Sequence, residues 1–113
     1  LARKVEKARK LAGPRFLILL APCPPGWDFD PKESVEIGQL AVRTGVWPLK
    51  EYVNGEIVHT KVPYSRLPVE EYLKRQGRFH HLFSPKRNDE VLNEVQARVD
   101  AYWQGVKENS PVH

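Results

Sequence analysis

The apolar positions of the chain form one continuous run near the N-terminus, with helical patterns on either side of it. Residues 16–21, FLILLA, contain no polar position, which is typical of a strand buried on both faces of a parallel sheet. The segment before this run predicts a helix that ends at Gly13-Pro14. The apolar face of that helix contains Leu1, Val5, Ala8 and Ala12. A helix followed by a two-sided strand is half of an α/β unit, so the pattern predicts an α/β fold.

A second helix is predicted to begin after Asp30. Asp30 caps it, Pro31 takes the first helical position, and Glu33 completes a capping box three residues after the cap. Gly45 ends the helix. The face predicted to be buried contains Ile37, Leu40, Ala41 and Thr44.

A β-hairpin is predicted over residues 49–60. The dipeptide Asn54-Gly55 favours a type I′ turn, because both of its residues tolerate a positive φ. Residues 49–53 are therefore expected to pair with residues 56–60. His59 is interpreted as an ordinary side chain of the second strand.

Two helices are predicted in the C-terminal half. A short one covers residues 68–77, and an irregular segment follows it. The face of the short helix contains Val69, Tyr72, Leu73 and Gln76. The longest helix begins after a cap at Asn88 or Asp89. Its apolar stripe contains Val91, Val95, Val99, Tyr102 and Val106.

One strand cannot form a parallel sheet, so either its partner strands come from elsewhere or the segment is not a strand. We interpret the chain as the C-terminal part of a larger α/β protein. Residues 1–113 are then one segment of a domain. Within it, residues 1–48 form a helix, a strand, a loop and a helix. Residues 49–60 form the hairpin, and residues 68–108 form the C-terminal helices.

Composition agrees with an ordinary soluble globular chain, with 41% hydrophobic and 28% charged residues among 113. A single cysteine excludes a disulfide within the chain and fits a reducing compartment. The apolar run is too short to cross a bilayer, and the chain shows no signal-peptide pattern. We therefore expect a cytoplasmic protein with no membrane partner.

The net charge of +4 comes largely from LARKVEKARK at the N-terminus. Such a segment is a candidate nucleic-acid patch. No aromatic residue is interleaved with its charges, as stacking on single strands requires. The solvated face of an amphipathic helix is the preferred interpretation, and no nucleic-acid partner is expected.

Candidate chemistry centres on Cys23, which lies beyond the carboxyl end of the predicted strand, where ligands bind in α/β sheets. One interpretation is an inert core thiol. The other is a ligand or reactive group, since a Cys-Pro pair occurs in iron–sulfur ligand runs. His80-His81 is a poor metal site, because adjacent side chains diverge and no acidic or cysteine ligand is suitably spaced. Asp28 and Asp30 form a possible carboxylate pair, although Asp30 is already explained as a cap.

Three stretches carry a resemblance to a known family: APCPPGW, VEIGQLAVRTGVWPLKEYVNGE and PVEEYLKRQGRFHHL. From about residue 13 to residue 103, the chain resembles the C-terminal third of the β subunits of pyruvate:ferredoxin oxidoreductases, in the 2-oxoacid:ferredoxin oxidoreductase family. The resemblance implies a thiamine-diphosphate-binding type of parallel-sheet domain. It also implies oxidative decarboxylation of pyruvate to acetyl-CoA and CO2, with coenzyme A and ferredoxin as partners beside the other subunits.

The resemblance assigns one site residue. The family's APC motif supplies the fourth cysteine ligand of a [4Fe-4S] cluster, and Cys23 matches it. Thiamine diphosphate and magnesium are held by family segments that this chain does not contain, so no thiamine ligand is assigned and the chain alone is not expected to catalyse. Pro25 departs from the family, which commonly has threonine at this position. The difference affects what can be expected of the reduction potential of the cluster, but not the expectation that Cys23 is a ligand.

Two alternatives remain open. In the first, the chain is a non-catalytic interaction domain with Cys23 as an inert core residue. In the second, it belongs to the same family but acts on a branched-chain 2-oxoacid or on oxalate. Trp27 and Trp47 would shield a cluster from water, although simple packing is the preferred interpretation of both.

Overall fold

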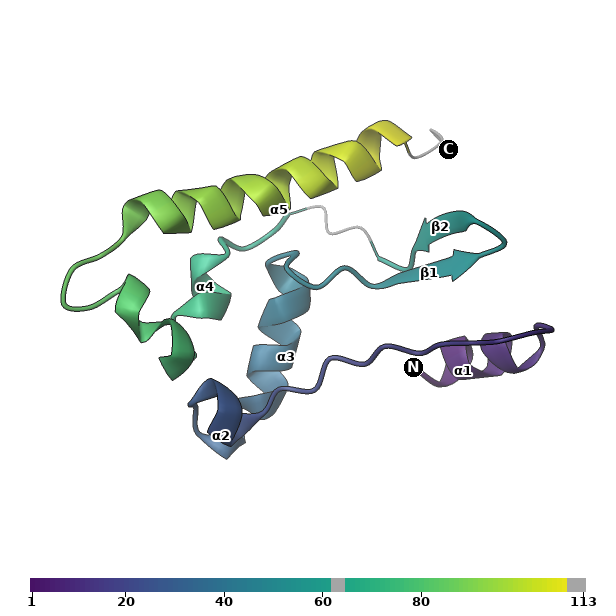
Figure 1. Ribbon diagram of the computed structural model, residues 1–113, viewed down its shortest axis with the longest axis horizontal. Coiled ribbons are helices and arrows are strands. Elements are labelled where there is room, and N and C mark those ends of the chain that lie inside the picture. The colour runs from purple at the N-terminus through teal and green to yellow at the C-terminus, as the bar shows by residue number, and fades with distance from the viewer. Residues whose placement is uncertain (62–64, 110–113) are drawn as a thin grey trace.

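The computed structural model describes residues 1–61 and 65–109, which form helices and one two-stranded antiparallel sheet. The elements are α1 (Ala2–Arg9), α2 (Pro24–Trp27), η1 (Pro31–Glu33), α3 (Ser34–Arg43), β1 (Lys50–Val53), β2 (Glu56–His59), α4 (Glu70–Leu73), η2 (Gly77–Leu82) and α5 (Asp89–Asn109). Figure 1 shows a helical half formed by α2 to α5, with α1 and the hairpin on the other side. The radius of gyration is 16.4 Å, against about 13 Å for a compact domain of this length. The molecule is therefore elongated.

The hydrophobic core lies where α3, α4, η2 and the first turns of α5 meet. Its buried residues are Ile37, Leu40, Ala41, Val69, Tyr72, Leu73, Leu82 and Leu92. Each large side chain buried in this way stabilises the fold by about 1.5–3 kcal/mol. Further along α5, Trp103 is 1% exposed, and its Nε1–H donates to the carbonyl of Gly45 at 2.9 Å.

The predicted cap at Asp30 is confirmed, but Glu33 does not complete the predicted capping box, and the α-helix itself begins at Ser34. The carboxylate of Asp30 accepts a hydrogen bond from the backbone N–H of Lys32 at 3.0 Å, and the 3₁₀ turn η1 leads into α3. All four residues of the predicted face are buried. The carboxylate of Glu33 accepts a hydrogen bond from Arg75 at 3.0 Å, which ties η1 to the end of α4.

The predicted hairpin is also confirmed. Lys50 pairs with His59 and Val53 pairs with Glu56, with Asn54 at φ +52° in the turn. Nε2 of His59 lies 2.7 Å from the hydroxyl of Tyr102, so a side-chain hydrogen bond joins the hairpin to α5.

The C-terminal half differs from the prediction in detail. The short helix is reduced to α4, although its predicted face is buried, and residues 77–82 form a 3₁₀ helix instead of an irregular segment. Asn88 provides the cap of α5, since its Oδ1 accepts from the N–H of Val91 at 3.2 Å. The buried stripe of α5 is shifted: Leu92 and Trp103 lie deepest, whereas Tyr102 is exposed.

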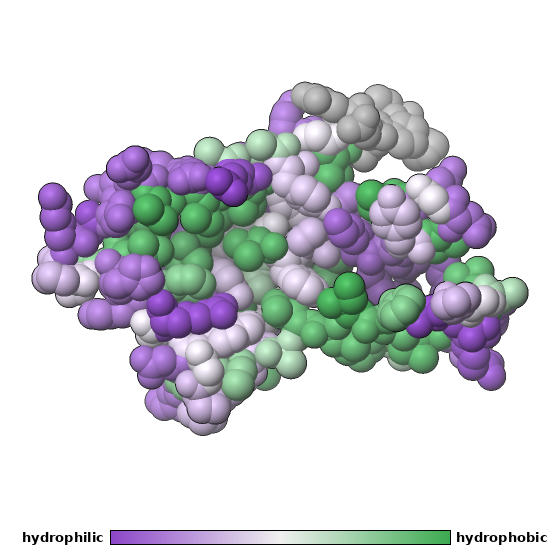
Figure 2. Space-filling model, viewed as in Figure 1, coloured by the Kyte–Doolittle hydropathy of each residue, from purple (hydrophilic) through white to green (hydrophobic). Residues whose placement is uncertain are grey.

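The strand prediction for residues 16–21 is wrong for the chain as the structure describes it. The segment runs extended between α1 and α2 but has no neighbouring strand, so no ladder of hydrogen bonds forms. Its side chains are exposed instead of buried on both faces, except for Leu20, which packs against the core; Ile18 is 83% exposed. Figure 2 shows the resulting hydrophobic band where Figure 1 draws this segment. Within the described residues, the sheet is antiparallel and not parallel.

Helix α1 is shorter than predicted. It ends at Arg9, before Gly13-Pro14, and none of its residues is buried. Two contacts attach it to the hairpin: Lys7 pairs with Glu51, and the Nζ of Lys4 donates to the carbonyl of Lys50. Both of these attachments are polar, whereas Leu1 and Val5 of the predicted apolar face are exposed.

Candidate functional site

Cys23 lies at the junction between the extended segment and the helical half of the molecule. It immediately precedes α2, and its carbonyl accepts a hydrogen bond from the backbone N–H of Trp27 at 2.8 Å. Pro24 occupies the first helical position, where the missing N–H costs nothing. The thiol is exposed. It is thus not enclosed by aliphatic side chains.

The absence of a side chain at Gly26 contributes to this exposure. A Cβ at this position would lie 3.3 Å from Sγ of Cys23, which is closer than an ordinary van der Waals contact. Glycine therefore leaves open one side of the sulfur that any other residue would cover. The loop presents the thiol on the surface.

A close approach between α2 and η2 holds the end of this loop. Asp28 adopts a left-handed conformation at φ +58°, and its carbonyl accepts a hydrogen bond from the N–H of Gly77 at 2.7 Å. The carboxylate of Asp28 lies over Gly77, where a Cβ would overlap it. Only glycine fits at position 77 in this arrangement.

Arg78 provides a second attachment. Its guanidinium carbon lies 4.0 Å from the ring centroid of Trp27 and 4.7 Å from that of Phe79. Its Nε–H donates to Oε1 of Gln76 at 2.8 Å. Gln76 is 1% exposed, and its amide nitrogen donates to the carbonyl of Tyr72 at 2.7 Å.

The two tryptophans named from the sequence occupy different places. Trp27 belongs to the loop itself and packs beside Phe29, with ring centroids 6.3 Å apart. The backbone N–H of Trp47 donates to the carbonyl of Ala41 near the C-terminal end of α3. Both rings are partly buried against the core, but only Trp27 is part of the Cys23 loop.

The structure does not assemble the other candidate ligands. His80 and His81 are both exposed on η2. Asp30 caps η1, and the hydrogen bonds from Lys32 lower the pKa of its carboxyl group, whereas the Asp28 carboxylate lies over Gly77. Within residues 1–61 and 65–109, no group of three or more His, Cys, Asp and Glu side chains is arranged to hold a metal ion.

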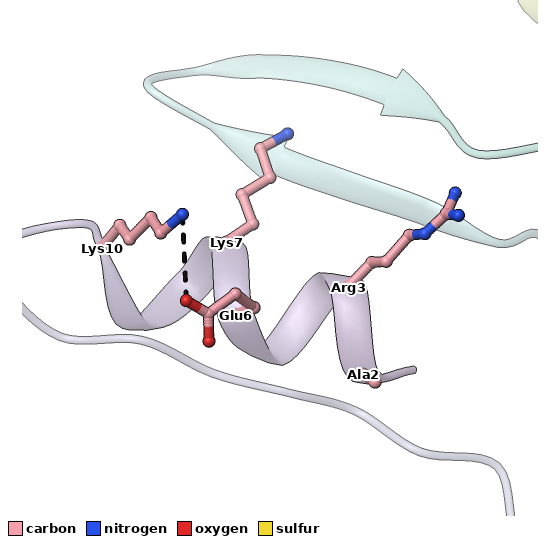
Figure 3. Close-up of a pocket in the computed structure, with 5 residues that line it drawn as sticks. All are labelled: Ala2, Arg3, Glu6, Lys7 and Lys10. Carbon is pink, nitrogen blue, oxygen red and sulfur yellow. Dashed lines mark ion pairs between the residues drawn. The ribbon is translucent and has the colours of Figure 1, made fainter.

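Three basic side chains at the C-terminal end of α1 and in its cap form ion pairs with acidic residues of the same chain. Lys7 pairs with Glu51 at 2.5 Å, while Arg9 and Lys10 lie 2.9 Å and 3.8 Å from Glu6. Figure 3 shows the shallow surface hollow on this helix, with Lys7 extended toward the hairpin and Lys10 turned to Glu6. This hollow is open and holds no enclosed cavity.

Sequence reasoning did not find the residues that hold the Cys23 loop. It placed Gln76 on a buried helix face and treated Arg78 as part of an irregular segment. The available signal is the stretch QGR at the end of the predicted short helix. In it, an amide on the face predicted to be buried is followed directly by a glycine and an arginine. A buried amide needs hydrogen-bond partners, and that requirement points to its polar neighbours.

Comparison with known proteins identifies relatives that are similar in sequence over most of this chain. The PorB subunit of pyruvate synthase from Methanosarcina barkeri is 45% identical over 98 residues, which make up 87% of this chain and 33% of that protein. The PorB subunit from Thermotoga maritima is 44% identical over 101 residues, covering 89% and 31% of the two chains. The chain is homologous to part of PorB. The resemblance predicted from the motifs is confirmed.

The homology covers a C-terminal part of these relatives, and the chain spans about a third of their length. A second kind of relative is the VorB subunit of ketoisovalerate oxidoreductase from Pyrococcus furiosus. It is 39% identical over 112 residues, which make up 97% of this chain and 34% of that protein. No known family model matches the sequence. None of the helices in the described ranges is both long and apolar enough to span a membrane.

Proposed function

We propose that the chain is part of a PorB-like subunit of a 2-oxoacid:ferredoxin oxidoreductase, in which Cys23 is the thiolate ligand of a [4Fe-4S] cluster. The observation that carries the proposal is an exposed thiol on a loop fixed to the core, in a chain homologous to PorB. The proposed reaction is the oxidative decarboxylation of pyruvate with coenzyme A and ferredoxin.

The described residues are suited to supply one ligand of the cluster. A thiolate is the ligand that iron–sulfur clusters use. The described residues provide only this sulfur, so the remaining cysteines come from other polypeptide in the proposed assembly. Thiamine diphosphate and magnesium do not fit the described side chains, which form no group of metal ligands. We assign both to other parts of the enzyme.

The loop sets the surroundings of the sulfur. A bound cluster supplies one-electron transfer toward ferredoxin. Pro24 and Pro25 have no N–H and therefore donate no hydrogen bond to the sulfur. Hydrogen bonds to the sulfur stabilise the additional negative charge of the reduced cluster. A cluster with fewer of these bonds therefore has a lower reduction potential. The ring of Trp27, in the same loop, is partly buried against the core.

The exposed apolar run supports an assembly with other polypeptide. Phe16, Leu17, Ile18 and Leu19 are all exposed in the described structure. Burying each of these side chains would contribute about 1.5–3 kcal/mol. We propose that parallel strands from the remainder of a PorB-like subunit take up residues 16–21 in a thiamine-diphosphate-binding type of domain. Cys23 would then lie at the carboxyl edge of that sheet.

A second substrate is supported by one comparison. Identity to a ketoisovalerate oxidoreductase subunit is 39%, close to the 45% found with a pyruvate synthase subunit. A branched-chain 2-oxoacid is therefore the second candidate. Activity of the assembled enzyme with pyruvate and with 2-ketoisovalerate distinguishes the two.

The test of the ligand role is Cys23→Ser in the assembled enzyme. We expect a loss of about four iron atoms per subunit, because one cluster loses a thiolate ligand. Pro25→Thr is the matched control: it alters the same loop but keeps the sulfur, so the iron content stays at the wild-type value. An unchanged iron content in Cys23→Ser would refute the ligand role.

A further inference from the structure

The loop that carries Cys23 is too short to hold its own conformation. Helix α2 has four residues, and its backbone hydrogen bonds run from Trp27 to Cys23 and from Asp28 and Phe29 to Pro24. Isolated helices shorter than about 12 residues are marginal in water, because nucleation is costly. The direction of the thiol therefore depends on contacts from outside the loop.

Arg78, which is exposed to solvent on its outer side, makes one of these contacts. Its guanidinium lies over two aromatic rings, at 4.0 Å from the centroid of Trp27 and 4.7 Å from that of Phe79. A cation over an indole ring contributes about 0.5–2 kcal/mol, depending on its exposure to water. The planar guanidinium stacks on such a face in a way that a lysine ammonium does not.

Two hydrogen bonds through the buried amide of Gln76 fix the position of Arg78 in turn. Nε of Arg78 donates to Oε1 of Gln76, and Nε2 of Gln76 donates to the carbonyl of Tyr72. Both ends of the buried amide are thus satisfied, which sets its orientation. These contacts run from Tyr72 in the core to Trp27 in the loop.

The contact between Asp28 and Gly77 is a separate attachment. It is a backbone hydrogen bond of 2.7 Å and does not involve the side chain of Arg78. A change at Arg78 should therefore loosen the loop without detaching it from η2. The function of Arg78 can be tested without unfolding the protein.

We propose that Arg78 is a positioning residue for Cys23, which fixes the direction of the thiol by holding Trp27 while it is itself held by a hydrogen bond to the buried Gln76. The consequence for a cluster rests on the function proposed above, whereas the effect on the loop does not. Arg78 itself makes no contact with reacting atoms in this proposal.

The first test measures loop motion in the full chain without any cluster. Because Cys23 is the only cysteine, a nitroxide spin label attached to it reports on this loop alone. We expect Arg78→Gln to shorten the rotational correlation time of the label by roughly a factor of two or more. Arg78→Lys should behave in the same way, because lysine keeps the charge but loses the stacked plane and the Nε donor.

Arg75→Gln is the matched control. Arg75 is three residues away and pairs with Glu33, outside the Cys23 loop. Its replacement should leave the spectrum of the label unchanged. Trp27→Leu removes the ring from the other side of the contact and should reproduce the effect of Arg78→Gln. An unchanged spectrum in Arg78→Gln, or an equal change in Arg75→Gln, would overturn the proposal.

The second test uses the assembled enzyme. We expect Arg78→Lys to retain its iron and to shift the midpoint potential and the electron paramagnetic resonance spectrum of the reduced cluster, with Arg75→Gln unchanged. A wild-type potential and spectrum in Arg78→Lys would contradict the proposal. If Cys23→Ser keeps its iron, the proposed function fails, and the spin-label measurement still decides the role of Arg78.

Discussion

The helical half and the N-terminal arm (residues 1–22) use similar apolar residues with opposite results. Ile37 of α3 is 0% exposed, whereas Ile18 of the arm is 83% exposed. Both lie in segments whose pattern predicts burial. The difference is that α3 finds α4 and α5 within the chain, and the arm finds no comparable partner among the described residues. An apolar pattern thus indicates that a segment is to be buried, but it does not specify which polypeptide covers the segment.

Cys23 lies where these two regions join. The loop after it is attached to the helical half through Asp28 and Arg78, and before it Leu20 packs against the core and Pro22 lies close to Gly38 of α3. The exposed apolar stretch lies further from the thiol, at residues 16–19. This arrangement suits a residue that completes a site together with other polypeptide.

The largest expected effect compares the two isoleucines directly. Ile37→Ala should lower the free energy of unfolding of the chain by about 2–5 kcal/mol, because it leaves a cavity in a packed core. Ile18→Ala should change it by less than about 0.5 kcal/mol, as is usual for an exposed side chain. Urea denaturation followed by circular dichroism measures both. Equal losses would contradict the division into two regions.

The arm should change its behaviour in the assembled enzyme. Amide hydrogens of residues 16–21 should exchange rapidly in the chain alone, since no ladder protects them. In the assembly, parallel strands on both sides should slow their exchange by roughly 100-fold or more, corresponding to an opening free energy of about 3 kcal/mol. Hydrogen exchange followed by mass spectrometry resolves this segment. Fast exchange in both samples would argue against the strand.

A smaller effect is expected at the junction. Gly26→Ala places a Cβ at 3.3 Å from Sγ of Cys23 and should slow alkylation of this thiol by iodoacetamide several-fold. Gly105→Ala is the control, because a Cβ there meets nothing within 4 Å. Alkylation is followed by intact mass. A rate in Gly26→Ala equal to that of the control would show that the thiol is open on other sides.

The smallest effect concerns pH and the attachment of the hairpin to α5. Burial, and secondarily the charge of Lys50, lower the pKa of His59 from its ordinary value of 6.5. The unfolded chain therefore binds this proton more readily than the folded chain. The contribution of His59 to stability is complete above pH 6.5 and is lost as the pH falls toward its folded pKa.

The midpoint temperature of thermal unfolding should accordingly decrease when the pH is lowered from about 7.5 to about 5.5. His59→Gln removes the titrating group, keeps an amide that can bond to Tyr102, and should reduce this pH dependence. The hydroxyl of Tyr102 lies 2.7 Å from Nε2 of His59, and the charge of Lys50 acts on the ring; both groups are kept in the variant. An identical pH dependence in the variant would exclude His59 as its source.

Local signals in the sequence predicted the elements that depend on local contacts. Asp30-Pro31 marked the start of η1 and α3, Asn54-Gly55 marked the hairpin turn, and Asn88 marked the cap of α5. Each signal acts through hydrogen bonds or dihedral angles within a few residues. The sequence is sufficient for such features.

Features that depend on distant partners could not be predicted in the same way. The strand over residues 16–21 needs neighbours that the described chain does not provide. Trp103 replaces Tyr102 as the buried aromatic of α5 because the carbonyl of Gly45 accepts its N–H. The link from Gln76 through Arg78 to Trp27 joins residues 49 positions apart along the sequence. Periodicity and turn signals depend on residues a few positions apart, so they do not predict contacts between residues that lie far apart in the sequence.

The most direct measurement of the central claim locates the iron. Anomalous diffraction at the iron edge, on crystals of the assembled enzyme, identifies each iron atom and its protein ligands. The account predicts an iron atom bonded to Sγ of Cys23, with cysteines of other polypeptide on the same cluster. A cluster with four other ligands, and Cys23 packed without metal, would contradict it.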